Sequence, residues 1–119
     1  MDDESLIASM VALSQPTRLA TFRRLIAAEP RGIAAGDLAR LVGVPQNTLS
    51  THLAILARAG LIEGVRQSRS IIYRAVFARV REVALFLIQD CCGGRPEICD
   101  PIVADLTGCC SPSTTEARV

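Results

Sequence analysis

The stretch GDLARLVGVPQNTLSTHLAILARAGLIEGVR, residues 36–66, decides the fold of this 119-residue chain. A short helix is predicted over about residues 35–41, because Gly43 follows its apolar residues and glycine commonly ends helices. A second helix is predicted over about residues 46–59, and Gly60 ends it. Two helices joined by so short a glycine-containing turn predict a helix-turn-helix.

The second of these helices is predicted to have one apolar and one polar face. Leu49, Leu53 and Leu56 recur every three or four residues, which predicts a buried stripe. The opposite side carries hydrogen-bonding residues, which suit either the reading of DNA or simple solvation. These residues are Gln46, Asn47, Thr48, Ser50, Thr51 and His52.

A β-hairpin is predicted directly after the helix-turn-helix. Residues 61–66 and 70–75 are rich in Ile, Val and Tyr, and the polar segment 67–69 separates them. A helix-turn-helix followed by a basic hairpin forms a winged helix. We therefore predict a mostly α fold with one β-hairpin, a winged helix-turn-helix.

Two helices are predicted before this motif. Residues 5–13 form a short helix, and Ser14 and Pro16 resemble the cap and first-turn proline of the next one. The apolar stripe of the first helix is Leu6, Met10 and Leu13. The stripe of the second is Leu19, Phe22 and Ile26.

A long helix over residues 77–92 follows the hairpin, and Gly93 and Gly94 end it. Its apolar stripe is Phe77, Val80, Ala84, Leu87 and Ile88. This stripe and that of the N-terminal helix lie outside the helix-turn-helix core, so they need a partner. A second copy of the chain is the simplest partner, so we expect a homodimer that forms through the N-terminal and last helices.

Charge is distributed unevenly along the chain. The net charge is +1, but residues 1–14 carry −3, residues 15–81 carry +8 and residues 82–119 carry −4. A basic middle between acidic ends indicates a face that binds a polyanion, although a solvated surface would also explain it. The helix pattern divides the chain into a winged-helix DNA-binding and dimerisation domain, residues 1–92, and a Cys-containing, partly mobile tail, residues 93–119.

Composition argues against several other classes of protein. Aromatic residues make up only 3% of the chain and Trp is absent, which disfavours a platform for stacking single-stranded bases. The longest apolar run, VALFLI at residues 83–88, is far shorter than the roughly 20 residues that span a bilayer. The N-terminus MDDESL is acidic and has no basic leader, so we expect no secretory signal, no membrane partner and a cytoplasmic location.

All five cysteines lie in the last 29 residues, at Cys91, Cys92, Cys99, Cys109 and Cys110. An odd number of cysteines without a leader argues against a disulfide framework, and in a reducing compartment clustered thiols more often bind metals or act as sensors. A helix is predicted over residues 101–107, capped by Asp100 and followed by Gly108. Its length of about 10 Å would keep Cys99 away from the last two cysteines.

Three segments together resemble the ArsR/SmtB family of bacterial winged-helix metalloregulators. They are SQPTRLATFRRL at residues 14–25, the deciding stretch at residues 36–66, and IYRA at residues 72–75. The resemblance covers residues 5–92. The double Cys at the end of the last helix, followed by a third Cys, is similar to the As(III) site of a subset of arsenical repressors.

The chain departs from the family pattern at three points. Many arsenic sensors carry Cys-x-Cys in the first helix of the helix-turn-helix, whereas residues 36–39 hold no Cys. Zinc and nickel sensors use His and carboxylate ligands on the last helix, where this chain has only Glu82 and Asp90 and no His. The wing tip, often Gly in the family, is Ser68 here, which leaves the type of turn open.

The resemblance implies double-stranded operator DNA as a partner. A helix fits the major groove, and Gln and Asn can bond bidentately to adenine, so the six polar residues of the second helix are candidate contacts. His52 is the only His of the chain and would face DNA as in the family, unless it is an ordinary surface residue. Candidate contacts to phosphate or the minor groove are Arg58, Arg66, Arg69 and Arg74, each of which could also be an ordinary surface arginine.

The resemblance also implies trivalent arsenic as the inducer and no organic cofactor. As(III) is soft and takes three thiolates, which Cys91, Cys92 and Cys99 would supply. Cys109 and Cys110 could bind a second ion, capture a methylated arsenical, cap the same site or have no specific role. The expected function is a dimeric repressor that binds operator DNA and releases it when arsenite, antimonite or a methylated As(III) compound binds.

Alternatives on the same fold are thiol redox sensing and Zn or Cd sensing. A tetrahedral zinc site needs a fourth ligand, and the usual C-x2–4-C spacing is absent. Enzyme classes fit poorly, because no Cys is followed six positions later by Arg, as a thiol-based arsenate reductase requires, and no Gly-rich phosphate loop is present. We therefore expect a regulator and not an enzyme.

Overall fold

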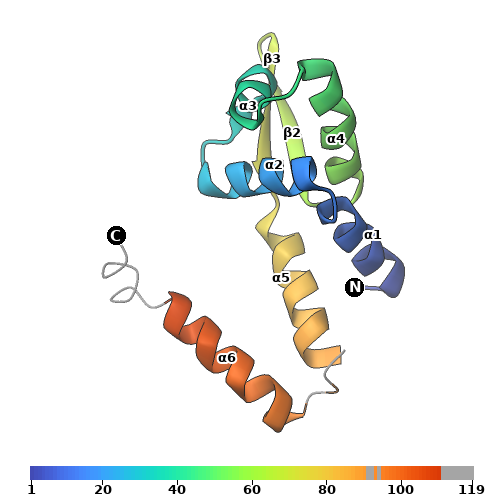
Figure 1. Cartoon of the computed structure of the whole chain (residues 1–119), viewed down its shortest axis with the longest axis vertical. Coiled ribbons are helices and arrows are strands. Elements are labelled where there is room, and N and C mark those ends of the chain that lie inside the picture. Colours follow the sequence, from blue (N-terminus) through green and yellow to red (C-terminus); the bar gives the residue numbers. More distant parts are fainter. Residues whose placement is uncertain (91–92, 94, 111–119) are drawn as a thin grey trace. The chain divides into compact units, whose positions relative to one another are not determined.

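The computed structural model describes residues 1–90, 93 and 95–110. They form two compact units, one over Met1–Val83 and a second that begins at Ala84. The boundary expected after residue 92 falls inside the second unit and remains a prediction. The first unit contains α1 (Asp3–Leu13), α2 (Pro16–Ala27), β1 (Ile33–Ala34), α3 (Ala35–Val42), α4 (Gln46–Arg58), β2 (Ile62–Gln67) and β3 (Ser70–Ala75), and its helices gather around the hairpin (Figure 1).

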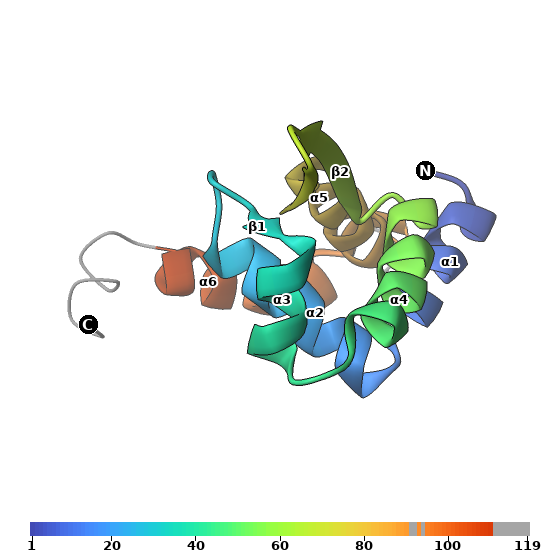
Figure 2. The same ribbon diagram turned by 90° about the horizontal axis from the view of Figure 1, so that it is seen from above.

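The predicted helix-turn-helix and wing are confirmed. Helix α3 ends at Gly43, whose φ of 84° is the left-handed conformation that glycine adopts readily. Helix α4 follows three residues later, packs against α3 and lies beside it in Figure 2. Strands β2 and β3 pair antiparallel from Ile62↔Ala75 to Gln67↔Ser70, so Ser68 and Arg69 alone form the hairpin loop.

One strand was not predicted. Strand β1 pairs antiparallel with β3 through Ile33↔Tyr73 and Ala34↔Ile72, so β3 is the middle strand of a three-stranded sheet. Strands are predicted from alternating apolar and polar residues, and a two-residue strand is too short to show such a pattern. Its consequence is that the wing is hydrogen-bonded to the segment that leads into α3.

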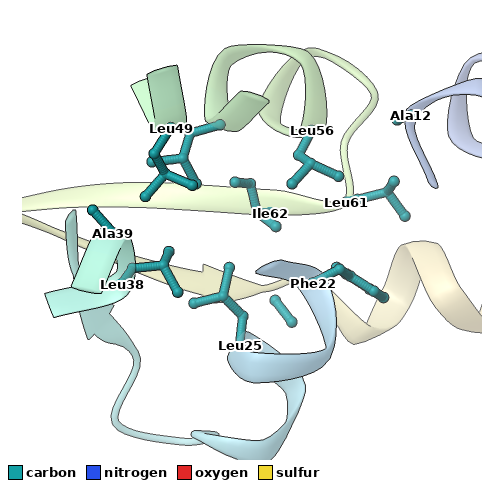
Figure 3. Packing of buried hydrophobic residues seen from close by; sticks show 11 residues of the cluster. Ala12, Phe22, Leu25, Leu38, Ala39, Leu49, Leu56, Leu61 and Ile62 are labelled. Atoms are coloured by element: carbon teal, nitrogen blue, oxygen red, sulfur yellow. The ribbon is translucent and has the colours of Figure 1, made fainter. Parts of the chain in front are cut away.

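Leucines of α2, α3 and α4 form the core together with the first strand of the wing. Leu25, Leu38, Leu49 and Leu56 are fully buried and point toward one another (Figure 3). The predicted stripe of α4 is therefore confirmed, with Leu53 only 2% exposed. Each such leucine contributes roughly 1.5–3 kcal/mol by burial, so α4 is fixed by its apolar side.

Helix α1 begins earlier than predicted, and its buried face only partly matches the predicted stripe: Leu6 is buried and Leu13 packs against the core. Asp2 caps it, because its Oδ1 accepts a hydrogen bond from the Ser5 N–H at 3.3 Å. The buried residues are Leu6, Ser9 and Ala12, whereas Met10 is 49% exposed. Ser9 could be buried because its hydroxyl donates to the Ser5 carbonyl at 3.0 Å, a solution that a count of apolar residues misses.

The start of α2 is also corrected. Gln15, not Ser14, is the N-cap, since its Oε1 accepts from the Arg18 N–H at 2.8 Å. Ser14 instead ends α1, and its hydroxyl donates to the Val11 carbonyl at 2.7 Å. Pro16 occupies the first turn as expected.

The buried face of α2 differs from the predicted stripe at two of its three positions. Phe22 is buried as expected, and Leu25 is fully buried. Leu19 and Ile26 are only half-buried. Thr21 joins the buried face because its hydroxyl donates to the Thr17 carbonyl at 2.7 Å.

The predicted last helix is α5 (Phe77–Leu85), continued by a π-helical segment, Phe86–Asp90. Its predicted end at Cys91 and Cys92 lies outside the described residues. Within α5 itself no residue is buried, and Phe77 is 49% exposed. Val80 of the predicted stripe packs against the core of the first unit, and the homodimer stays a prediction.

The second unit contains helix α6 (Pro96–Cys110), which is twice as long as the helix predicted over residues 101–107. It begins at Pro96 because the Arg95 carbonyl accepts from the N–H groups of Ile98 and Cys99, both at 3.0 Å. Pro101 lies inside the helix, where it removes one backbone donor without ending it. Among the described residues, no helix combines the length and apolar character needed to cross a membrane.

Candidate nucleic-acid interface and thiol site

The polar side of α4 lies at the surface, as the sequence predicts. Gln46, Asn47, Thr48, Ser50 and Thr51 are all exposed, and His52 is half-buried at the edge of this face. Two of the side chains are held locally: Asn47 Oδ1 accepts from the Thr48 N–H at 2.9 Å, and the Ser50 hydroxyl donates to the Gln46 carbonyl at 3.0 Å. The remaining donors and acceptors of this face are exposed, as contacts to base edges in a major groove would require.

The wing supplies positive charge beside this helix. Arg66 and Arg69 are exposed at the tip end of β2 and in the hairpin loop. They line a groove of about 360 Å³ together with Gln46 and Ser50 of α4. The side chains predicted to read bases and those predicted to bind phosphate therefore line the same groove.

The other two predicted arginines lie in different settings. The Arg74 guanidinium pairs with Glu29, with Nη2 2.7 Å from Oε2, and this hydrogen bond raises the pKa of Arg74 above its ordinary value. Arg58 is in the last turn of α4 and lines a separate hollow with Ala8 and Val11 of α1. Phosphate contacts by these two residues remain predictions, and for Arg74 such a contact would compete with Glu29.

His52 has a partner that sequence analysis missed. Arg18 of α2 places Nη1 3.4 Å from His52 Nδ1, across 34 positions of sequence. No local pattern connects two residues so far apart, so only the packing of α2 against α4 shows the pair. The Arg18 guanidinium therefore contacts the imidazole of His52 at Nδ1.

Of the five cysteines, the structure describes the side chain of Cys99. It lies half-buried in the first turn of α6, and its Sγ donates to the Ile88 carbonyl oxygen at 3.1 Å. Cys91 and Cys92 lie outside the described residues, as do the side chains of Cys109 and Cys110. The backbone of α6 separates the Cα atoms of Cys99 and Cys109 by about 15 Å along the helix axis. Among the described residues, no three Cys, His, Asp or Glu side chains gather closely enough to hold a metal ion.

The fold and the polar helix beside a basic wing define a winged helix-turn-helix protein. A helix-turn-helix domain model matches residues 13–65. Among curated proteins, the biofilm growth-associated repressor of Xylella fastidiosa is 33% identical over 78 residues, which cover 64% of this chain and 66% of the repressor. The HTH-type transcriptional regulator YgaV of Escherichia coli is 34% identical over 70 residues, 59% of this chain and 69% of YgaV.

A solved structure extends the likeness over almost the whole chain. The ArsR-like transcriptional regulator from Rhodococcus sp. RHA1 superposes with a TM-score of 0.67 and 26% identity, and the match covers 92% of this chain and 95% of that one. The chain belongs to the ArsR family of winged helix-turn-helix transcriptional regulators.

Proposed function

We propose that this protein is a homodimeric repressor that binds double-stranded operator DNA and releases it when As(III) binds Cys91, Cys92 and Cys99. The exposed polar side of α4 and the arginines of the wing support DNA binding, because they line one groove. The biofilm repressor that this chain resembles supports repression as the outcome. Arginine contacts to phosphate make the binding strongly dependent on salt.

The dimer is supported by apolar side chains that the first unit leaves at its surface. Ile7, Met10 and Val11 of α1 are 59%, 49% and 55% exposed. Burying them against a second copy would stabilise the assembly, since apolar surface contributes about 25 cal/mol per Å². A dimer would place two copies of α4 in successive major grooves, about 34 Å apart.

The observation that carries the As(III) part of the proposal is the place of Cys99. Its thiol touches the carbonyl of Ile88, the residue three positions before Cys91. The third cysteine thus contacts the segment that precedes the vicinal pair in the sequence. Soft thiolates select soft ions, and binding As(III) as a thiolate would require Cys99 to give up its hydrogen bond to Ile88.

Release of DNA needs only a modest coupling between the two sites. A coupling of about 1–3 kcal/mol weakens DNA binding roughly 5- to 150-fold, which is enough for derepression. The Ile88 carbonyl belongs to the π-helical segment that continues α5. A change at Cys99 is therefore passed to the end of the helix that we expect to form the dimer.

The test is a fluorescence-anisotropy titration of reduced protein onto a labelled duplex carrying the DNA upstream of its own coding sequence. Arsenite, zinc, cadmium and peroxide are then added in turn. Arsenite alone should release the duplex, and excess dithiol should reverse the release. Release by peroxide alone would instead indicate a redox switch, and release by zinc or cadmium a metal sensor with a fourth ligand.

Cysteine variants assign the site. Cys91→Ser and Cys92→Ser should bind the duplex as the wild type does and no longer release it with arsenite, because two thiolates hold As(III) less tightly than three. Cys109→Ser is the matched control and should still respond. Release that survives in both the Cys91 and Cys92 variants would contradict the assignment, and so would release lost only in the control.

A further inference from the structure

Arg18 is held by two carbonyl groups in the last turn of α1. The last carbonyls of a helix have no donor four residues later within it, and the residue four positions after Ala12 is Pro16, which has no N–H. Arg18 Nε donates to the Ala12 carbonyl at 2.7 Å, and Nη2 donates to the Val11 carbonyl at 3.4 Å. A cation at a helix C-terminus also interacts favourably with the helix dipole. The guanidinium therefore has a fixed place.

The remaining nitrogen of the guanidinium faces the recognition helix. Arg18 Nη1 lies 3.4 Å from His52 Nδ1, and α1, α2 and α4 all contact one another here (Figure 2). Arginine can only donate hydrogen bonds, so this contact is a hydrogen bond in the tautomer whose Nδ1 is unprotonated. A neutral imidazole then carries its proton on Nε2, and a second proton on Nδ1 would set two donors against each other.

The position of His52 on α4 would allow its Nε2–H to donate a hydrogen bond to another molecule. His52 lies one turn after exposed Thr48 and one turn before buried Leu56, at the border between the polar and apolar sides of α4. Its Nδ1 is engaged by Arg18, so a contact of this ring with another molecule would fall to Nε2. A neutral N–H can donate to a phosphate oxygen or to a base-edge acceptor such as guanine N7 or O6.

We propose that Arg18 is a positioning residue for DNA binding: anchored on the end of α1, it holds His52 as an Nε2–H donor aimed at an acceptor on DNA. The inference rests on the proposed DNA-binding function and adds to it a residue that does not itself touch DNA. It also joins the end of α1, a helix expected at the dimer interface, to the helix expected to read DNA.

The first test reads the imidazole directly and uses no DNA. His52 is the only histidine, so a long-range ¹H–¹⁵N correlation spectrum of the ring is free of overlap. The wild type should show an unprotonated Nδ1 and a protonated Nε2. Arg18→Ala should move both ring shifts toward a mixture of tautomers, while Arg23→Ala, an exposed arginine of the same helix, should leave them unchanged. A protonated Nδ1 in the wild type would overturn the proposal.

The second test measures affinity for the labelled upstream duplex. Arg18→Ala should weaken binding about three- to tenfold, the value of one hydrogen bond, and Arg23→Ala should weaken it less. In a His52→Ala background, Arg18→Ala should cause little further loss, because it acts through the imidazole. Equal losses in the two arginine variants, or the full loss again in the His52→Ala background, would refute the proposal.

Two additions keep the tests decisive. If Arg18→Ala does not fold, Arg18→Lys retains the charge but lacks the forked donors, so the ring shifts should still move. A scrambled duplex separates the two acceptors: a loss on both duplexes indicates phosphate, and a loss on the upstream duplex alone indicates a base edge. Should the wild type bind neither duplex, the proposed function fails, whereas binding with the wrong tautomer removes only the role of Arg18.

Discussion

Two glycines with nearly the same backbone conformation should respond very differently to substitution by alanine. Gly32 and Gly43 have φ values of 80° and 84°, so a side chain at either position is strained. A Cβ on Gly43 would meet nothing within 4 Å. A Cβ on Gly32 would lie 2.7 Å from the backbone oxygen of Tyr73 and 2.7 Å from Arg74 Cγ. The pair therefore separates backbone strain from steric overlap.

The magnitudes follow from these distances. The left-handed conformation costs a non-glycine residue roughly 1–2 kcal/mol, and this cost applies to both variants. Gly32→Ala adds overlap with the backbone of β3, which cannot rotate away, and overpacking costs about 1–3 kcal/mol more. We expect Gly43→Ala to lower the free energy of unfolding by about 1–2 kcal/mol and Gly32→Ala by about 2–5 kcal/mol.

Urea unfolding followed by far-UV circular dichroism measures both values. The extra loss in Gly32→Ala corresponds to a melting temperature lower by about 4–8 °C per kcal/mol. Gly32→Ala should also weaken DNA binding, because the overlap pushes on the middle strand of the wing, whereas Gly43→Ala should affect stability more than affinity. Equal losses of stability in the two variants would show that Gly32 does not pack against β3 as described.

Three further outcomes are expected. Thr51→Ala should weaken binding to the upstream duplex and leave arsenite affinity unchanged; unchanged duplex affinity in a band-shift titration would reject the assignment of α4 to DNA. Arg69→Ala should reduce the slope of log K against log salt by about 1, and Arg74→Ala by less because Glu29 already neutralises that guanidinium; equal slopes would contradict this. Ser68→Gly should raise the free energy of unfolding by about 0.5 kcal/mol. The φ of 59° at Ser68 is strained for serine, whereas glycine adopts it without strain and loses only backbone freedom on folding. A lower urea midpoint for the variant would show that Ser68 is not strained.

Sequence reasoning succeeded where one local rule was enough. The end of α3 at Gly43 and the leucine stripe of α4 follow from glycine chemistry and helical spacing, and the structure confirms both. The hairpin was predictable because two β-rich runs flank a short polar break. Ser68 shows that the loop tolerates a residue other than glycine, at the first loop position, with a positive φ.

The failures share a different cause. Ser9 and Thr21 are buried because their hydroxyl groups return to the preceding turn of the helix, so polarity alone predicts the wrong face. Strand β1 exists only through its pairing with β3. The contact of Arg18 with His52 depends on how three helices pack, which no pattern within one helix contains.

Tyr73 gives the protein a spectroscopic reporter. It is the only tyrosine of a chain without tryptophan, so its emission dominates the intrinsic fluorescence. The side chain stands in the middle strand of the sheet and lines the groove between α4 and the wing, close to Gly64. Its quantum yield should change when that groove is filled or widened. Occupation of the groove by a ligand can therefore be followed in the unlabelled wild-type protein, in real time and without a reporter on the DNA.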